Sequence, residues 1–596
     1  MKLSDLVIES LAERGIRHLF LVSGGGIMHM VDSAGSSTRV RYVCNFHEQA
    51  SVIAAEAYAR VTNGVGACLV TTGPGATNAL SAVPGAWFDS IPIVVLSGQV
   101  RLPLIANYER VRQNGPQEVN IIPMAVPVTK YAKTIREPER IAEELDLAFE
   151  AATSGRPGPV WIDLPLDVQA TEVSASPKPA PRKETPASDE LRDAVAHTVE
   201  LLAIARRPMF IAGHGIRLGH AMNELSAFLA RTQLPVIVPI SAMDLVPESY
   251  AGHMGAFGPI GRRAANFALQ NADLVVSIGA SLSISATGFN TAGFAPKAKK
   301  VVVNVDPGEI EKSSLHIDLP VVADAGAFLR ELLRQLGDGA PPSRDRWLAA
   351  CADWKLRYPP GPPPDFIHPD YVNSYALAEE LSRQMQPGEI VVGGISLDVA
   401  SLYQSFRVKE GQRVLVNANY GAMGWDLPAA VGACVAADGA RVVLVTGDGC
   451  IQFNIQELQT VRSNDLNLRI FVLNNAGYES IRTTQKNWFE GRFVGSDFGS
   501  GIGNPDFQKL AEAYGLAYVK MDDPASMAER VAEVLEHDGP VICEVMVSPD
   551  QPRTPRASSF RREDGTMESR PIEDLFPFLP REEVHANMHM FDDEDA

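Results

Sequence analysis

Cysteine is scarce in this sequence, and no two cysteines have the spacing of a metal-binding or redox motif. Six of the 596 residues are cysteines, and none of them forms a CxxC pair. Buried free thiols in a reducing compartment have this pattern, whereas a disulfide scaffold or a structural zinc site does not. The six are Cys44, Cys68, Cys351, Cys434, Cys450 and Cys543.

Long apolar runs and an excess of positive charge are also missing. Charged and turn-forming residues interrupt every apolar stretch, so we expect no membrane-spanning helix. With 53 Lys and Arg against 72 Asp and Glu, the formal charge of −19 disfavours binding to nucleic acids and anionic membranes. The N-terminal segment MKLSDLVIESLAERG carries acidic residues within an apolar pattern, which predicts an amphipathic helix rather than a signal peptide. We therefore expect a cytoplasmic protein.

The residues that are present give the composition of a globular protein. Hydrophobic residues make up 45% of the chain and charged residues 21%, which excludes a disordered or fibrous protein. At roughly 100 to 200 residues per domain, a chain of this length is long enough for about three domains.

Two stretches rich in proline and charge show no apolar period and are predicted to be linkers. They are Thr171–Glu190 and Gly337–Pro369, and they divide the chain into thirds. The acidic end FDDEDA is predicted to be a frayed, solvated tail. The predicted domains span residues 1–170, 191–337 and 370–550, followed by a C-terminal segment of residues 551–596.

Within each third, short apolar runs alternate with segments of helical period such as Glu48–Arg60. This alternation is typical of parallel sheets covered by helices, so we predict an α/β fold with three doubly wound parallel-sheet domains. The outer thirds share a strand, a glycine turn and a helix, in CLVTTGPG and VLVTGDG, which indicates two related halves. The predicted strands include residues 18–22, 66–72, 92–98, 208–213, 235–240, 274–279, 301–306, 389–394, 441–449, 469–475 and 540–547.

The most specific motif is GDG at Gly447–Gly449, followed after a spacer by the pair Asn474 and Asn475. Both lie where a predicted strand ends, which is where ligands bind in open parallel sheets. Mg²⁺ prefers about six oxygen ligands, and Asp448, the Asn475 side chain and the Gly477 carbonyl supply three. A glycine-rich turn without a ligand is the alternative for GDG taken alone.

The glycines around Asp448 also allow the backbone to approach a diphosphate closely. The segment Ile451–Ser463 is predicted to continue as a helix whose N-terminal amides face the anion.

The combination of GDG, a spacer of about this length and NN resembles the signature of thiamine-diphosphate enzymes, and the resemblance extends along almost the full chain. NFHEQAS at Asn45–Ser51, TTGPGATN at Thr71–Asn78 and NYGAMGWDLPAAVGA at Asn419–Ala433 are similar to motifs of the acetolactate synthase large-subunit branch. NVDPGEI at Asn304–Ile310 is similar to the same branch. The resemblance implies a pyrimidine-binding domain, a central domain and a diphosphate-binding domain.

By this resemblance, two residues of the first domain take part in the reaction. Glu48 corresponds to the glutamate that hydrogen-bonds N1′ of the aminopyrimidine and so assists proton removal from C2 of the thiazolium ring. A carboxylate at a helix N-terminus is the alternative for this residue. Gln117 corresponds to a glutamine near the reacting centre.

The resemblance also implies the cofactor contacts. Met423 would hold the cofactor bent, the carbonyl of Gly421 would bind its 4′-amino group, and the turn Gly394, Ile395, Ser396 would meet the diphosphate. The metal ligands would be Asp448, Asn475 and Gly477. The remaining cofactor-binding residues are Gly24, Asn78, Gly447, Gly449, Cys450 and Tyr478.

Four departures from the acetolactate synthase pattern concern substrates and cofactors. Thr484 stands about where a tryptophan usually shapes the acceptor pocket, and Pro116 replaces a phenylalanine before Gln117. The arginine of the FAD-binding stretch is not evident in Gly279–Gly288, so FAD is not supported by the sequence, and FAD, another nucleotide or no ligand stay open for the central domain. No adjacent His-His pair exists, which disfavours a simple decarboxylase; single histidines such as His47 are interpreted as structural.

We therefore predict a thiamine-diphosphate and Mg²⁺ dependent transferase that decarboxylates a 2-keto acid, with pyruvate as the favoured donor, and joins the two-carbon unit to a carbonyl acceptor. Because the site residues are split between domains, the resemblance implies a homodimer or homotetramer with interfacial active sites. The alternatives are acetyl transfer to a ketone or nucleotide-linked ketosugar, a non-ligating decarboxylase or lyase, and a catalytically silent homologue. The C-terminal segment is a candidate active-site cap, in which Arg561, Arg562 and Arg570 would suit an anionic acceptor.

Overall fold

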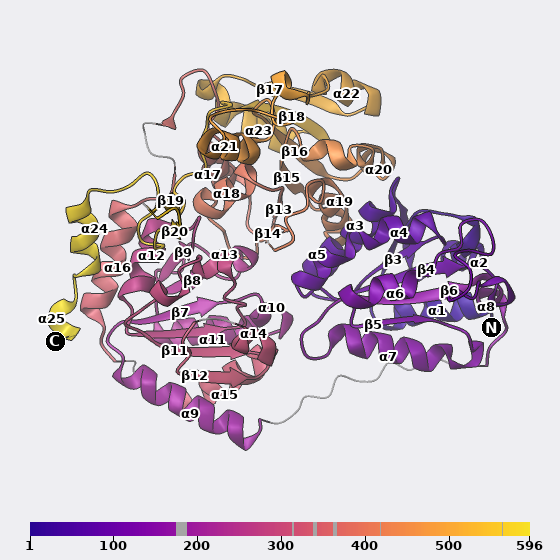
Figure 1. Cartoon of the computed structure of the whole chain (residues 1–596), viewed down its shortest axis with the longest axis horizontal. Helices are drawn as coiled ribbons and strands as arrows, with labels where there is room; N and C mark the ends of the chain where they lie inside the picture. Colours follow the sequence, from indigo (N-terminus) through magenta and orange to yellow (C-terminus); the bar gives the residue numbers. More distant parts are fainter. Residues whose placement is uncertain are drawn as a thin grey trace.

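The computed structural model describes residues 1–174, 187–312, 315–337, 342–361, 366–417, 419–562 and 564–595. It contains three six-stranded parallel sheets, and helices flank each of them (Figure 1). This confirms the predicted α/β fold class. Among the described residues, no helix is both long enough and apolar enough to cross a membrane.

The N-terminal sheet has the strand order β2-β1-β3-β4-β6-β5. Its strands are β1 (His18–Leu21), β2 (Arg41–Cys44), β3 (Gly66–Val70), β4 (Ile93–Gln99), β5 (Tyr131–Thr134) and β6 (Val160–Pro165). Its helices are α1 (Leu3–Glu13), α2 (Met28–Ser36), α3 (Glu48–Thr62), α4 (Pro74–Leu80), α5 (Val83–Phe88), α6 (Ile121–Ala125), α7 (Ile141–Thr153) and α8 (Leu166–Ala170). The predicted amphipathic N-terminal helix is α1, which buries Leu3, Leu6 and Leu11.

The C-terminal sheet has the equivalent order, β14-β13-β15-β16-β18-β17. Because corresponding strands occupy corresponding places, the predicted relation between the outer thirds is confirmed at the level of topology. Its strands are β13 (Ile390–Gly393), β14 (Arg413–Leu415), β15 (Val442–Gly447), β16 (Leu468–Asn474), β17 (Ala517–Met521) and β18 (Val541–Met546). Its helices are α17 (Ser374–Gln384), α18 (Leu397–Ser405), α19 (Asp426–Ala436), α20 (Glu457–Ser463), α21 (Glu479–Trp488), α22 (Phe507–Tyr514) and α23 (Met527–Glu536).

The central sheet differs from both, with the order β12-β11-β10-β7-β8-β9. Counted within the domain, this is the 3-2-1-4-5-6 order of dinucleotide-binding folds, whose direction reverses between β7 and β10. Its strands are β7 (Pro208–Ala212), β8 (Val236–Val238), β9 (His253–Ala256), β10 (Leu274–Ile278), β11 (Lys299–Asn304) and β12 (Leu319–Val322). Its helices are α9 (Asp189–Ile204), α10 (Gly215–Leu218), α11 (Met222–Thr232), α12 (Arg263–Asn271), α13 (Ile284–Thr287), α14 (Pro307–Glu311), α15 (Ala325–Leu336) and α16 (Asp345–Arg357).

The two outer domains are joined by the packing of α3 against α19, and one apolar core runs through both. The helices approach so closely that a Cβ atom on Gly432 would lie 2.1 Å from the main-chain oxygen of Ala54. Glycine is therefore required at that crossing. The contact matters for function because α3 begins at Glu48 and α19 directly follows the segment that carries Met423.

The second predicted linker is wrong over α16. Trp347 and Trp354 of this helix are almost fully buried against the central domain, and proline-rich flanks hid their helical spacing in the sequence. Residues 175–186 of the first predicted linker lie outside the described residues.

The prediction of a frayed acidic tail is also wrong. Asp593 and Glu594 bind Arg346, and Glu594 also accepts a 3.0 Å hydrogen bond from the buried Arg207. These ion pairs dock the chain end on the central domain beside α16 (Figure 1). The C-terminal segment consists of β19 (Ser559–Arg561), β20 (Met567–Ser569), α24 (Arg581–Met588) and α25 (Asp592–Asp595).

Candidate active site

The first group of predicted site residues lies at the carboxyl edge of the N-terminal sheet. Gly24 follows β1 and packs on Thr71, which follows β3; a Cβ atom on Gly24 would lie 2.5 Å from Thr71 Cβ. Glu48 is the first residue of α3, and its Oε2 accepts a 3.0 Å hydrogen bond from the amide of Asn78. Gly75 lies against the other oxygen of the same carboxylate. The structure thus brings Gly24, Glu48 and Asn78 to one edge.

Gln117 lies next to this group. Its φ of 63° is in the left-handed region, and its main-chain oxygen accepts a 3.2 Å hydrogen bond from the Thr72 hydroxyl. A Cβ atom on Gly73 would lie 2.1 Å from that same oxygen. The glycine turn after β3 therefore determines where the Gln117 backbone can lie. The side chains of Pro116 and Gln117 are exposed in the single chain.

Glu118 organises the loop before Gln117, a role that sequence reasoning did not assign to it. Its buried carboxylate accepts hydrogen bonds from the backbone N–H groups of Ala106 and Asn114 and from the Tyr108 hydroxyl. Burial disfavours ionisation of Glu118, but these hydrogen bonds outweigh it and lower its pKa. An ionised carboxylate therefore holds the loop together.

The second group is centred on Asp448, at the end of β15. Asp448 Oδ1 accepts a 2.8 Å hydrogen bond from the N–H of Gly449, and Oδ2 accepts one of 3.1 Å from the N–H of Gly477. The GDG motif and the turn after the Asn pair are thus in direct contact. Asn504, which sequence reasoning missed, donates a 2.7 Å hydrogen bond to the same Oδ2. Burial raises the pKa of Asp448.

Arg482, another residue that sequence reasoning missed, holds the turn after β16 in place through hydrogen bonds to its carbonyl groups. Its guanidinium donates to the main-chain oxygens of Asn475 at 2.9 Å and Ala476 at 2.8 Å. Gly477 has φ of 133°, and a Cβ atom there would lie 2.4 Å from the oxygen of Ser496. Asn475 is buried in this turn.

Two further predicted cofactor residues, Tyr478 and Met423, lie over the GDG turn. A Cβ atom on Gly449 would lie 2.2 Å from a ring carbon of Tyr478 and 3.5 Å from the terminal methyl carbon of Met423. A Cβ atom on Gly421 would likewise lie 3.5 Å from the end of the Ile395 side chain. Segments that are far apart in sequence therefore face the same small volume.

The turn after β13 completes this group. Ser396 has φ of 83°, and its hydroxyl bonds to Glu479 and Ser480 at the start of α21. A Cβ atom on Gly394 would lie 2.2 Å from Asp398 Oδ2 and 2.8 Å from Asp426 Oδ2. Burial, and then the neighbouring Asp426, raise the pKa of Asp398.

Cys450 lies beside the same two carboxyl groups, and burial raises the pKa of its thiol. The segment after it differs from the predicted continuous helix. A 3-10 turn spans Ile451–Asn454, and α20 begins only at Glu457.

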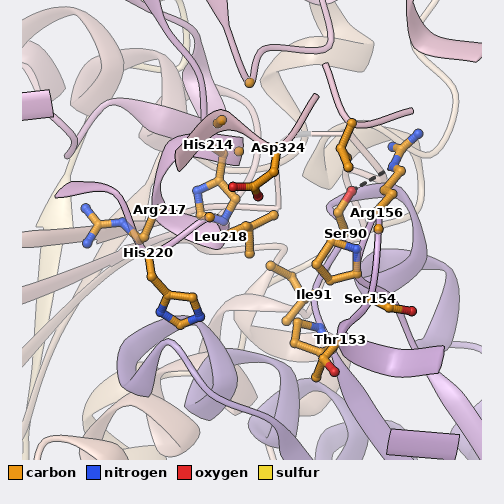
Figure 2. A pocket seen from close by; sticks show the side chains of 18 of the residues that line it. Ser90, Ile91, Thr153, Ser154, Arg156, His214, Arg217, Leu218, His220 and Asp324 are labelled. Carbon is orange, nitrogen blue, oxygen red and sulfur yellow. Dashed lines mark hydrogen bonds between the residues drawn. The ribbon is translucent and has the colours of Figure 1, made fainter. Parts of the chain in front are cut away.

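A large cavity lies between the N-terminal and central domains, and its volume is about 1330 Å³ (Figure 2). It opens at the carboxyl ends of β7 and β10, where the strand order of the central sheet reverses. His214 of this lining is partly buried, and its two ring nitrogens are buried without a hydrogen-bond partner among the described residues. Burial, and then the charge of Arg60, lower the pKa of His214 to about 3, so the ring is neutral at pH 7.

Comparison with protein-family models covers all three sheets. The model for "Thiamine pyrophosphate enzyme, N-terminal TPP binding domain" matches residues 1–124, the central-domain model matches residues 195–332, and the C-terminal TPP binding domain model matches residues 392–545. This chain belongs to the thiamine pyrophosphate enzyme family. The first and third matches contain the two groups of site residues described above.

Relatives of this thiamine pyrophosphate enzyme include acetolactate synthases. The chain is 32% identical over 562 residues to the acetolactate synthase large subunit of Corynebacterium glutamicum, covering 93% of this chain and 88% of that protein. It is 32% identical over 589 residues to the acetolactate synthase of Mycobacterium bovis, covering 96% and 92%. It is 29% identical to the isozyme 1 large subunit of Escherichia coli, covering 92% and 94%. The chain is therefore an acetolactate synthase-like enzyme that depends on thiamine diphosphate.

Proposed function

We propose that the enzyme decarboxylates pyruvate and joins the remaining two-carbon unit to a carbonyl acceptor. The observation that carries this proposal is the hydrogen bond between Asp448 and the Gly477 amide, because it joins the turns after β15 and β16, which hold the two halves of the diphosphate and metal motif. Glu48 and Asn78 supply the second half of the site, on the other outer domain.

The residues around Asp448 fit a magnesium ion and a diphosphate. Asp448, the side-chain oxygen of Asn475 and the carbonyl of Gly477 form an all-oxygen donor set, which is the type that Mg²⁺ prefers. Burial raises the pKa of Asp448, and a nearby cation would stabilise its ionised form, which supports the assignment of a magnesium ion here. We assign the turn at Gly394–Ser396 to the diphosphate.

Thiamine diphosphate, when bound, supplies the carbon nucleophile that attacks the keto group and takes up the electrons released with CO₂. The chain itself supplies proton transfer and shape. Glu48 exchanges a proton with the pyrimidine ring nitrogen, and Asn78 orients its carboxylate. Met423 and Tyr478 lie against Gly449, where Met423 would support a bent cofactor.

We also propose that a complete site needs two copies of the chain, in a homodimer or homotetramer. The side-chain bonds of Glu48 stay within the N-terminal domain, and those of Asp448 stay within the C-terminal domain. Mixing an inactive Glu48→Gln variant with an inactive Asp448→Asn variant tests this. If subunits exchange and the sites are interfacial, activity returns on mixing; two sets of self-contained sites would stay inactive.

The decisive experiment is incubation of purified protein with thiamine diphosphate, Mg²⁺ and pyruvate, with CO₂ and acetolactate measured together. Fast formation of both establishes acetolactate synthesis. Slow CO₂ release that a ketone or nucleotide-ketosugar accelerates establishes another acceptor, and no CO₂ redirects the search to another donor. Glu48→Gln is expected to bind cofactor and to lose roughly 10² to 10⁴ in rate, the usual contribution of general acid-base catalysis.

Acetyl transfer to a larger acceptor is the second candidate, because Thr484 stands where related synthases have a bulky ring. Thr484 is exposed, and its hydroxyl bonds back to the Ser480 carbonyl of its own helix at 3.0 Å. Thr484 would therefore leave room for a larger acceptor, but its hydroxyl is already hydrogen-bonded within its own helix. In the C-terminal segment, Arg562 is paired with Glu568 and Arg570 with Asp574, which weakens their assignment to an anionic acceptor.

We assign any nucleotide cofactor of this enzyme, FAD included, to the cavity at His214. The reversal of strand order beside it is the usual nucleotide position in such sheets, and two buried ring nitrogens are available for hydrogen bonds. The absorbance spectrum of purified protein and of the supernatant after denaturation identifies the ligand. A flavin gives visible absorbance, an adenine nucleotide absorbs only in the ultraviolet, and a clean supernatant excludes both.

A further inference from the structure

The segment that carries Gly421–Met423 is fastened at both ends to the N-terminal domain. Before Gly421, the side-chain amide of Asn419 donates a 2.6 Å hydrogen bond to Asp89 Oδ1. After Met423, the indole N–H of Trp425 donates a 3.0 Å hydrogen bond to Glu56 Oε2. Residues 419–425 are called the clamped segment below.

One arginine joins the two acceptors. Arg60 Nε donates to Glu56 Oε1 at 3.0 Å, and Nη2 donates to Glu56 Oε1 at 2.5 Å and to Asp89 Oδ2 at 2.6 Å. Each carboxylate therefore gives one oxygen to Arg60 and its other oxygen to the clamped segment. The guanidinium also lies 5.6 Å from the centre of the Trp425 ring.

This cluster is shielded from water. Exposed fractions are 0% for Glu56, 5% for Arg60 and 6% for Asp89, and Trp425 is 2% exposed. Buried charges are tolerated only when they are paired and hydrogen-bonded, and removal of one partner is strongly unfavourable. Each oxygen of the two carboxylates therefore has little freedom to move, and the groups bonded to them are held in place.

We propose that Arg60, Glu56 and Asp89 are positioning residues for the reaction, because they fix the clamped segment so that Met423 stays over Gly449. This inference rests on the proposed function, in which Gly421 and Met423 set the shape of the bound cofactor. The three residues touch no reacting atom in this scheme. Through them, the N-terminal domain holds a segment of the proposed cofactor site in the C-terminal domain in place.

The test removes one anchor at a time and leaves the Arg60 ion pairs intact. Asn419→Ala removes the donor to Asp89, and Trp425→Phe removes the donor to Glu56 while keeping an aromatic ring. Tyr420→Phe is the matched control, because it lies in the same segment and its hydroxyl makes only a 3.4 Å contact with the Ser81 carbonyl. All variants are made in the full chain.

Two measurements separate positioning from general stability. In protein without cofactor, hydrogen exchange of the peptide that covers residues 419–425 is expected to be faster in both anchor variants than in the control. With saturating thiamine diphosphate and Mg²⁺, exchange of the C2 proton of the cofactor is expected to slow by roughly tenfold to a hundredfold, since an ångström of misplacement costs about this much. The kcat for pyruvate should fall in parallel, and KM should change little.

Unchanged C2 exchange in both anchor variants would overturn the positioning role, even if their melting temperatures fell. Equal slowing in Tyr420→Phe would overturn it as well, because the effect would then belong to the segment and not to its anchors. If the wild-type protein bound no thiamine diphosphate, the proposed function would fail and this inference with it. That result is distinct from a functional wild type with unaffected variants.

Discussion

Asn504 and Asp448 are joined by a 2.7 Å hydrogen bond from the Asn504 amide to Asp448 Oδ2, although they lie 56 residues apart. The same amide also donates to Asn474 Oδ1 at 3.1 Å. Asn504 therefore sets the direction in which the proposed metal ligand presents its remaining lone pairs. Groups that orient a metal ligand in this way are normally worth one to two orders of magnitude in metal affinity.

We expect Asn504→Ala to weaken Mg²⁺ binding by roughly 10- to 100-fold in the presence of thiamine diphosphate. Isothermal titration with Mg²⁺ measures this directly. Asn464→Ala is the control, because the Asn464 amide bonds only to the Thr460 carbonyl of its own helix end. Wild-type Mg²⁺ affinity in Asn504→Ala would show that Asp448 does not depend on this hydrogen bond.

Gly73→Ala is expected to displace the loop that carries Gln117. The new Cβ would lie 2.1 Å from the Gln117 oxygen at a φ of 67°, so either the backbone or the loop must move. Overpacking of this kind costs about 1 to 3 kcal/mol. The free energy of unfolding, measured in urea, and the kcat for pyruvate should both decrease. Gly35→Ala, with nothing within 4 Å of the new methyl, should lower neither.

His214 is expected to make the protein less stable in mild acid. Its pKa is about 3 in the folded chain and 6.5 when exposed, so between these values the unfolded chain binds more protons. The contribution of His214 to the free energy of unfolding is therefore fully present above pH 6.5. It falls as the pH decreases, by about 2 kcal/mol between pH 7 and pH 5. Urea unfolding of His214→Leu should lack this part of the pH dependence. The exposed His316 provides the control in His316→Leu.

Asp398 should produce the opposite pH dependence. Its pKa is raised by burial and by Asp426, so the folded chain keeps a proton that the unfolded chain releases, and stability falls as the pH rises above the ordinary Asp range. Asp398→Asn removes the titration and keeps the shape. In urea unfolding, Asp398→Asn should become more stable relative to the wild type as the pH rises above the ordinary Asp range. Asp550→Asn, at an exposed position, is the control, and its free energy of unfolding should follow that of the wild type at every pH. The same parallel behaviour in Asp398→Asn would contradict the prediction.

Local sequence patterns were sufficient for eleven of the eighteen strands in the three described sheets and for the start of α3, but they did not identify β2, β5, β6, β9, β12, β14 and β17. Apolar runs such as residues 274–279 and 441–449 end in glycine turns, and each run contains a strand of the structure. A parallel strand that is buried on both faces must be apolar throughout, so the run alone identifies it. The motif residues Asp448 and Gly477 were also close enough to known patterns to be singled out, and their contact follows from the adjacency of β15 and β16.

Contacts between distant segments could not be read in this way. Asn504 and Arg482 stand in no motif, and each acts through hydrogen bonds that exist only after the chain has folded. Trp354 of α16 lies within a proline-rich stretch and finds its partner Asn587 in the C-terminal segment. The acidic tail was misjudged for the same reason, because Arg207 is distant in sequence.

The sequence by itself determined the α/β fold of three parallel sheets and the family, because these depend on local apolar patterns and on short glycine-rich motifs. The cofactor-binding residues that it indicates stay a prediction. Only the tertiary structure decided how Arg60 connects Glu56 and Asp89 to the two ends of the Met423 segment, and that the ring nitrogens of His214 face a cavity without a hydrogen-bond partner in the described part of the chain. The physical reason is burial: a charged or polar side chain is held by partners that the folded chain assembles from distant segments, and no local pattern encodes that assembly.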